Sequence, residues 1–351
     1  SIGSDAFYGC SGLTSIVIPN GVKSIGNDAF TRCFGLMSVT IPTSVTSIGA
    51  FAFKDCSSLT SVEIPNGVTA IQDGTFWGCS RLTDIYISDG VKCIGGLAFY
   101  ECSGLTSINL PGDMTTIDEG AFKNCTGLTS IIIPDNVIAI ESETFWGCSG
   151  LTSVTISNNA QIIGSRAFSS CSGLTFINIP DSVTGIEWDA FKDCRGLIGL
   201  SMGNSVTTIG DNAFNGCIGL NNLILSNNLT SIGSGVFSGC SSLTSLIIPN
   251  SVISIGKNAF YKCVEFTNIT IPDGVTSIGE WAFGGCDKLT SITISNNVIS
   301  IGSYAFCGCD TLTNIKFEGT KNQWNAILKE SNWNYDTGNY TIHCTDGDIE
   351  K

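Results

Sequence analysis

A cysteine recurs every 23 residues along most of this chain, without an insertion or a deletion. The fourteen positions are Cys10, Cys33, Cys56, Cys79, Cys102, Cys125, Cys148, Cys171, Cys194, Cys217, Cys240, Cys263, Cys286 and Cys309. A strict period in this range is typical of a solenoid, in which each repeat forms one coil and stacks on its neighbours. It overrides the two-domain division that 351 residues would otherwise suggest.

Other residue types keep the same register as the cysteines. Ile opens all fourteen repeats, Phe stands five residues later in all fourteen, and all eight prolines share one position. The segment L-T-S-I-x-I alternates in its second half, which indicates a short strand with one face inward, and Pro ends that strand. The stretch I-G-x-x-A-F-x-x-C favours a turn or a 3₁₀-like return. We therefore expect strands of successive coils to pair in parallel.

The repeat C-x-x-L-x-x-I-x-I-P-x-x-V-x-x-I-G-x-x-A-F-x-x-C resembles the 23-residue leucine-rich repeat of the BspA-like (treponemal-type) family. The resemblance covers residues 1–318. It implies a curved, right-handed leucine-rich-repeat solenoid with a parallel β-sheet on its concave face and short 3₁₀ or irregular returns. It further implies a secreted or surface-anchored protein, usually bacterial, of a family linked with adhesion to host proteins and cells.

The two ends of the chain depart from the repeat. Ser1 falls in mid-repeat, so we expect an N-terminal cap to be absent from this chain. Residues 319–351 are expected to form a C-terminal cap. Within it, Thr320 to Gln323 reads as a capping box that starts a short helix, and a short strand is expected at 340–342.

Composition excludes several classes of function. The net charge is −14 and no Lys/Arg cluster exists, which excludes nucleic-acid binding. No run of about 18 apolar residues is present, so we expect no membrane insertion. No phosphate-binding loop or EF-hand pattern appears, and no cofactor is expected. His343 is the single histidine, and acidic residues are expected to scatter over the return face, so neither a catalytic site nor an enzyme is predicted.

The cysteine row is expected to be a file of buried, reduced thiols. Stacked positions lie close enough for disulfides, but equivalent side chains of stacked coils point the same way, whereas a disulfide needs a torsion near 90°. A single file also does not converge on a metal, so no metal site is predicted. Cys93, Cys307 and Cys344 lie off the row, and exposure or pairing of Cys307 and Cys344 stays open.

The outward positions of the strands hold mostly Thr and Ser, so other side chains at these positions are candidate binding residues. The departures are Tyr86, Ile132, Phe176, Ile198, Ile224 and Ile247, of which the last four belong to consecutive coils and are expected to lie side by side. On the return side, two aromatic pairs recur at equivalent positions, Trp77 with Tyr100 and Trp281 with Tyr304. Such pairs suit sugar stacking or protein anchoring, or pack against neighbouring coils.

These features predict a monomeric, non-enzymatic binding or adhesion protein that acts outside the cell. Its expected partner is a host surface or matrix protein, bound on the extended surface that a solenoid offers. Carbohydrate binding through the aromatic pairs is the first alternative, and a passive spacer is the second.

Overall fold

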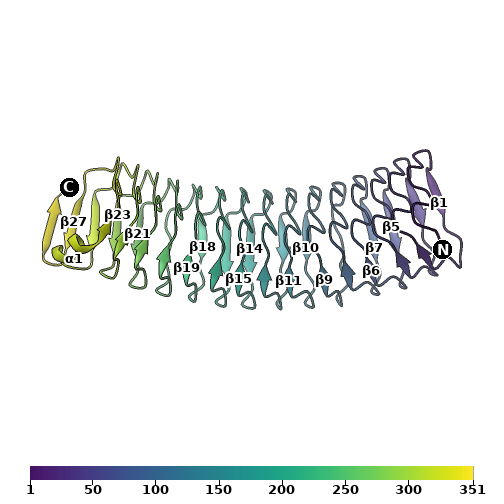
Figure 1. Ribbon diagram of the computed structural model, residues 1–351, viewed down its shortest axis with the longest axis horizontal. Helices are drawn as coiled ribbons and strands as arrows, with labels where there is room; N and C mark the ends of the chain where they lie inside the picture. The colour runs from purple at the N-terminus through teal and green to yellow at the C-terminus, as the bar shows by residue number, and fades with distance from the viewer. Residues whose placement is uncertain (351) are drawn as a thin grey trace. The chain divides into compact units, whose positions relative to one another are not determined.

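The protein is a solenoid of parallel strands, as the repeat predicts. The structure, a computed structural model, describes residues 1–350 and divides into two compact units, Ser1–Thr175 and Phe176–Lys351. Within each unit, successive 23-residue coils lie side by side in chain order (Figure 1). Each coil carries up to two short strands that pair with the same strands of the next coil.

The first strand of a coil lies in the L-T-S-I-x-I segment, as expected. In unit 1 these strands are β1 (Ser15–Val17), β3 (Ser38–Thr40), β5 (Ser61–Ile64), β7 (Asp84–Ile87), β10 (Ser130–Ile132) and β12 (Ser153–Thr155). In unit 2 they are β14 (Phe176–Ile179), β16 (Gly199–Met202), β18 (Asn222–Ile224), β21 (Asn268–Ile271), β23 (Ser291–Ile294) and β25 (Asn314–Phe317). Partners are 23 residues apart, as in Ser15 with Ser38, so the repeat length itself sets the register.

A second strand in each coil was missed by the sequence interpretation, which gave its Ile to the return. In unit 1 these strands are β2 (Ser24–Ile25), β4 (Ser47–Ile48), β6 (Ala70–Ile71), β8 (Cys93–Ile94), β9 (Thr116–Ile117), β11 (Ala139–Ile140) and β13 (Ile162–Ile163). In unit 2 they are β15 (Gly185–Ile186), β17 (Thr208–Ile209), β19 (Ser231–Ile232), β20 (Ser254–Ile255), β22 (Ser277–Ile278) and β24 (Ser300–Ile301). Strand β26 (Leu328–Lys329) of the C-terminal segment pairs in parallel with β24. Two residues are too few to show an alternating pattern, so only the stacking of coils reveals these strands.

The core consists of rows of identical side chains. Phe rings of neighbouring coils stack with centroids 5.1–5.6 Å apart in unit 1 and 5.2–5.7 Å apart in unit 2. Phe145, for example, is fully buried between Phe122 and Phe168. Burying one such ring stabilises the fold by about 1.5–3 kcal/mol. The repeated Phe therefore holds each coil against the next.

The returns are short and irregular, as expected, and they also hydrogen-bond from coil to coil. The Phe76 N–H donates to the Ala98 carbonyl of the next coil at 2.8 Å, and the Cys79 N–H closes a turn onto Phe76 at 3.0 Å. Two positions of each return take positive φ, which Gly adopts at little cost, as at Gly78 (φ 73°). These left-handed residues interrupt any continuous 3₁₀ helix, and none is present in residues 1–350.

The C-terminal segment continues the unit 2 sheet with different elements. Helix α1 (Lys321–Ala326) starts at the capping box formed by Thr320 and Gln323. Trp324 on this helix is buried against Phe317 and Trp333, with ring centroids 5.3 and 6.0 Å apart. Strand β27 (Thr341–Cys344) pairs in parallel with β25, and β28 (Gly347–Glu350) returns antiparallel to β27. Trp333 meets Phe306, the last Phe of the repeat, edge to face with centroids 6.0 Å apart.

Candidate functional site

The outward side of the first strands carries the side chains that differ most between coils. We call it the strand face, and three repeat positions form its three rows. In the coil that begins with the repeat Leu59, these positions are Thr60 in the first row, Ser61 in the second and Glu63 in the third. The third row is Val17, Thr40, Glu63, Tyr86, Asn109, Ile132 and Thr155 in unit 1, and Asn178, Ser201, Ile224, Ile247, Thr270, Thr293 and Lys316 in unit 2. Side chains alternate along a strand, so these residues point to solvent while their neighbours are buried.

The first row of the strand face is largely committed to the fold. Its threonines donate their hydroxyls to the carbonyl of the equivalent residue one coil earlier, as Thr152 does to Thr129 at 3.0 Å and Thr129 to Thr106 at 3.1 Å. These hydroxyls therefore satisfy the backbone and leave a neutral surface. Recognition on this face depends on the residues that interrupt the pattern.

Four such interruptions form the apolar patch of unit 2, which comprises Phe176, Ile198, Ile224 and Ile247. The structure leaves them 52%, 52%, 60% and 87% exposed, respectively. Phe176 pairs with Gly199, the residue after Ile198, and its ring occupies the space that a side chain at Gly199 would need. Ile224 and Ile247 hold one repeat position in consecutive coils. Ile198 belongs to the first row of the strand face, Phe176 to the second, and Ile224 and Ile247 to the third, so the four residues lie in consecutive coils but at three heights along the strands.

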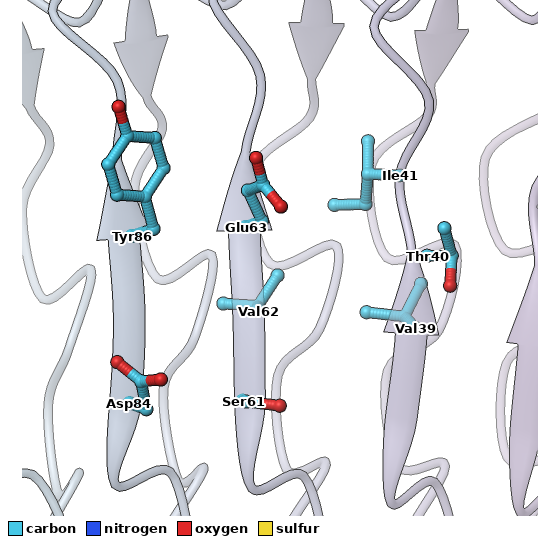
Figure 2. A pocket seen from close by; sticks show the side chains of 8 residues that line it. All are labelled: Val39, Thr40, Ile41, Ser61, Val62, Glu63, Asp84 and Tyr86. Atoms are coloured by element: carbon cyan, nitrogen blue, oxygen red, sulfur yellow. The ribbon is translucent and has the colours of Figure 1, made fainter.

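The other two predicted residues lie in unit 1 beside hollows of the strand face. Ile132 is 70% exposed and borders a hollow of about 270 Å³ with Asn109. Tyr86 is 58% exposed and stands between hollows of about 320 and 440 Å³ on β3, β5 and β7. We call this pair of hollows the Tyr86 groove; its first part is shown in Figure 2 and is lined by Val39, Thr40, Ile41, Ser61, Val62, Glu63, Asp84 and Tyr86.

The sequence analysis did not identify several residues that the structure exposes on the strand face. Glu63 and Asp84 place two carboxylates in the Tyr86 groove, so the expectation that acidic residues scatter over the return face is wrong for them. Val17 and Met37 are apolar and 74% and 53% exposed. All four replace Thr or Ser at an outward position, which is the signal that identified Tyr86.

The aromatic pair Trp77 and Tyr100 belongs to a row on the returns of unit 1. The two rings meet edge to face with centroids 4.9 Å apart. The Lys54 ammonium lies over the Trp77 ring, 4.0 Å from its centroid, and Lys123 lies 3.9 Å over Trp146. Cations thus already cover the indole faces that a sugar would stack on.

The pair Trp281 and Tyr304 in unit 2 is enclosed in a similar way. The rings stack in parallel with centroids 4.8 Å apart, and Tyr261 meets Trp281 edge to face at 5.8 Å. The Tyr304 hydroxyl accepts a hydrogen bond from Asn332 at 3.0 Å. Both pairs therefore pack within the chain, although Trp281 also borders a hollow of about 240 Å³ with Tyr261 and Glu280.

A family comparison fits this architecture of 23-residue coils. The model of the BspA type leucine rich repeat region matches residues 1–128, 94–221 and 207–331. The chain belongs to this family. No curated protein matches the sequence.

Solved structures of bacterial repeat proteins resemble the chain. A leucine-rich repeat protein from Bacteroides ovatus is 30% identical over 93% of this chain and 91% of that chain, with a TM-score of 0.75. One from Eubacterium ventriosum is 24% identical over 86% and 83%, with a TM-score of 0.51. A leucine rich cell surface protein from Faecalibacterium prausnitzii is 28% identical over 91% of each chain, with a TM-score of 0.45.

Thirteen of the fourteen row cysteines, Cys33 to Cys309, lie buried in the core, whereas Cys10 in the first repeat is exposed, so the expected burial is wrong for Cys10. The Cys148 thiol donates to the Phe122 carbonyl at 3.1 Å, and the same contact recurs along the row. Burial raises the pKa of the Cys148 and Cys240 thiols to about 12. Neutral thiols are poor nucleophiles and poor metal ligands, so the row has a packing role. The off-row Cys93, Cys307 and Cys344 are half-buried and free in the structure.

The remaining titratable groups form small local contacts. His343 and Asp348 meet at 3.0 Å on the exposed β27–β28 pair. Glu143 lies 2.7 Å from Lys123 and 3.3 Å from Arg166; burial would raise its pKa, but these two cations outweigh burial and lower it. Within residues 1–350, no group of three or more His, Cys, Asp or Glu side chains is placed to hold a metal ion. None of the helical structure in that range has the length and apolar character needed to cross a bilayer.

Proposed function

We propose that this protein is a non-enzymatic bacterial binding protein that adheres to host surface or matrix proteins through its strand face. Leucine-rich repeat proteins generally act as scaffolds for protein interactions, and a solenoid offers an extended, regular surface for them. A fold does not fix a function, so the residues on the face have to support the assignment.

The apolar patch is the observation that supports protein binding best. Phe176, Ile198, Ile224 and Ile247 are more than half exposed on a face otherwise lined by Thr, Ser and Asn. Clustered apolar side chains rimmed by neutral polar groups are typical of protein interaction sites, and aromatic residues supply much of the binding energy in such sites. Unit 2 therefore presents a site of the right chemistry for an uncharged protein surface.

A bacterial surface or secreted location is part of the proposal. An exposed apolar patch on a regular repeat scaffold suits a partner protein met outside the cell. Carbohydrate binding has less support, because lysines and neighbouring rings cover the aromatic pairs. A passive spacer would not need Phe176 and Ile224 on its surface, and it is the outcome if no partner binds.

The test is a binding screen against immobilised matrix and host surface proteins. We expect saturable binding of the wild-type protein to at least one of them, and at least a ~10-fold loss of affinity in the F176S/I224S variant, since two buried anchors are worth about 2 kcal/mol or more. Both residues are exposed, so the urea midpoint should stay unchanged.

The matched control is I253S/I299S, which removes two apolar side chains of unit 2 that are 57% and 69% exposed but lie beside the second strands. Its affinity should stay within ~2-fold of wild type. Equal losses in both variants, or no saturable binding to any protein of the screen, would contradict the proposal.

A further inference from the structure

We propose that the Tyr86 groove is a subsite for a cationic side chain, Arg or Lys, presented by a basic segment of a partner protein. This inference rests on the proposed protein-binding function and gives the strand face of unit 1 its partner chemistry. It is independent of the apolar patch, which lies in unit 2.

Register brings the three decisive side chains together on two paired strands. Glu63 of β5 is the direct partner of Tyr86 on β7, and Ser61 is the direct partner of Asp84. Paired strands lie about 4.8 Å apart, and residues two apart on one strand lie about 6.6 Å apart. Figure 2 shows the Tyr86 ring beside Glu63 and above Asp84 on the same side of the sheet. A ring and two carboxylates therefore border one hollow.

Both carboxylates lack a counter-charge of their own. Among the described residues, neither Glu63 nor Asp84 has an ion-pair or hydrogen-bond partner on its side chain. In the three strand-face rows of unit 1 they are the charged residues, and no Lys or Arg occurs in those rows. Some other acidic side chains of unit 1 do have a cationic partner, as Glu143 has Lys123. The groove thus presents two carboxylates without a cationic partner from the strand face of unit 1, which suits a cationic ligand.

The Tyr86 ring suits the same ligand. A guanidinium stacks on an aromatic face while its fork donates to a carboxylate, and an ammonium makes the corresponding cation–π contact. The chain shows this preference internally, because Lys54 and Lys123 cover the rings of Trp77 and Trp146. Among residues 1–350, no cation lies over the ring of Tyr86, which is 58% exposed. The face of the Tyr86 ring is therefore available to a cation of a partner protein.

The hollow also accommodates the stem of such a side chain. The Thr40 and Ser61 hydroxyls lie along it, and the mostly buried Val39, Ile41 and Val62 contribute its smaller apolar part. Lys and Arg bury their methylene stems along apolar surface while the charged head stays near acceptors. A basic peptide lying across β3, β5 and β7 would meet both requirements.

The experiment measures binding of a fluorescent 12-residue peptide of alternating Arg and Gly residues, with a Glu-Gly peptide of the same length as the reverse-charge probe. We expect saturable binding of the Arg-Gly peptide that weakens as salt rises, and none of the Glu-Gly peptide. The E63Q/D84N variant should lose at least ~10-fold in affinity, and Tyr86→Leu about 3- to 5-fold.

The matched control is D89N/E119Q, which removes the same charge from two exposed acidic residues of unit 1 outside the groove. It should stay within ~2-fold of wild type. Equal losses in the two charge variants would mean diffuse attraction to an acidic protein and would overturn the subsite. Binding of a neutral hexasaccharide that E63Q/D84N abolishes would also overturn it, because the ligand class would then be a sugar.

The experiments distinguish a wrong cationic subsite from a wrong proposed function. If E63Q/D84N leaves peptide binding intact while F176S/I224S abolishes binding to screened proteins, the subsite is wrong and the function stands. If the carboxylates control peptide binding while F176S/I224S has no effect on any partner, the apolar patch is wrong and the cationic subsite stands.

Discussion

The buried Phe row and the third row of the strand face belong to the same coils, yet their sequences differ completely. Phe occupies its position in all fourteen repeats, whereas the outward position of the strand holds eight residue types in fourteen repeats. Close packing explains the first row, because every ring touches the next and tolerates little change in volume. The outward side chains meet solvent, so they are free to differ. The scaffold and the binding surface are thus separate rows of one coil.

The largest expected effect lies in the buried row. Phe145→Ala removes a ring stacked on both sides at 5.5 and 5.3 Å, and we expect it to lower the free energy of unfolding by about 3–5 kcal/mol through the cavity it leaves. Urea denaturation measures this change. Thr155→Ala, on the strand face of the same coil, should change it by less than about 0.5 kcal/mol. Similar values for the two variants would remove the distinction between the rows.

A smaller loss of stability is expected on the return side, where Lys123 contributes to the packing of the coils. Lys123 is mostly buried, pairs with Glu143 and covers Trp146, so Lys123→Met should cost about 1–2 kcal/mol at pH 7. The control Lys92→Met breaks an exposed pair with Asp113 and should cost less than about 0.5 kcal/mol.

The same pair gives a pH dependence of known sign. The pKa of Glu143 is lower in the folded protein than in the unfolded chain. Its stabilisation is therefore present above the unfolded pKa of about 4.3 and is lost as pH falls through the folded value. The cost of Lys123→Met should shrink between pH 7 and pH 3 in urea titrations. A cost that stays constant would mean that packing, and not the ion pair, holds Lys123.

Sequence alone predicted the buried rows well because each is set by one repeated residue and one period. Ile, Phe, Leu and Cys at fixed spacing define the coil, and the register follows from the repeat length. The same logic identified Tyr86 and Phe176 as outward residues. It failed for the second strands, whose two residues show no periodicity until coils stack.

The candidate sites were harder to predict because they depend on neighbours across strands. Whether Ile198 meets Phe176 or Ile224 depends on its height along the strand, which consecutive numbering does not show. Glu63 and Asp84 can be recognised as candidate binding residues only in the folded structure, where they flank Tyr86 in a hollow that holds no Lys or Arg. Each of these sites combines side chains from two or three neighbouring coils, so the sequence of a single repeat does not reveal it.

The most direct test of the central claim, that the strand face and not the return side binds partners, is hydroxyl-radical footprinting of the wild-type protein. Side-chain labelling is compared with and without the partner that binds in the screen. We expect protection of Phe176 and Ile224, with unchanged labelling of Ile253 and Ile299. Protection of Trp77, Tyr100, Trp281 or Tyr304 with no change at Phe176 and Ile224 would contradict it.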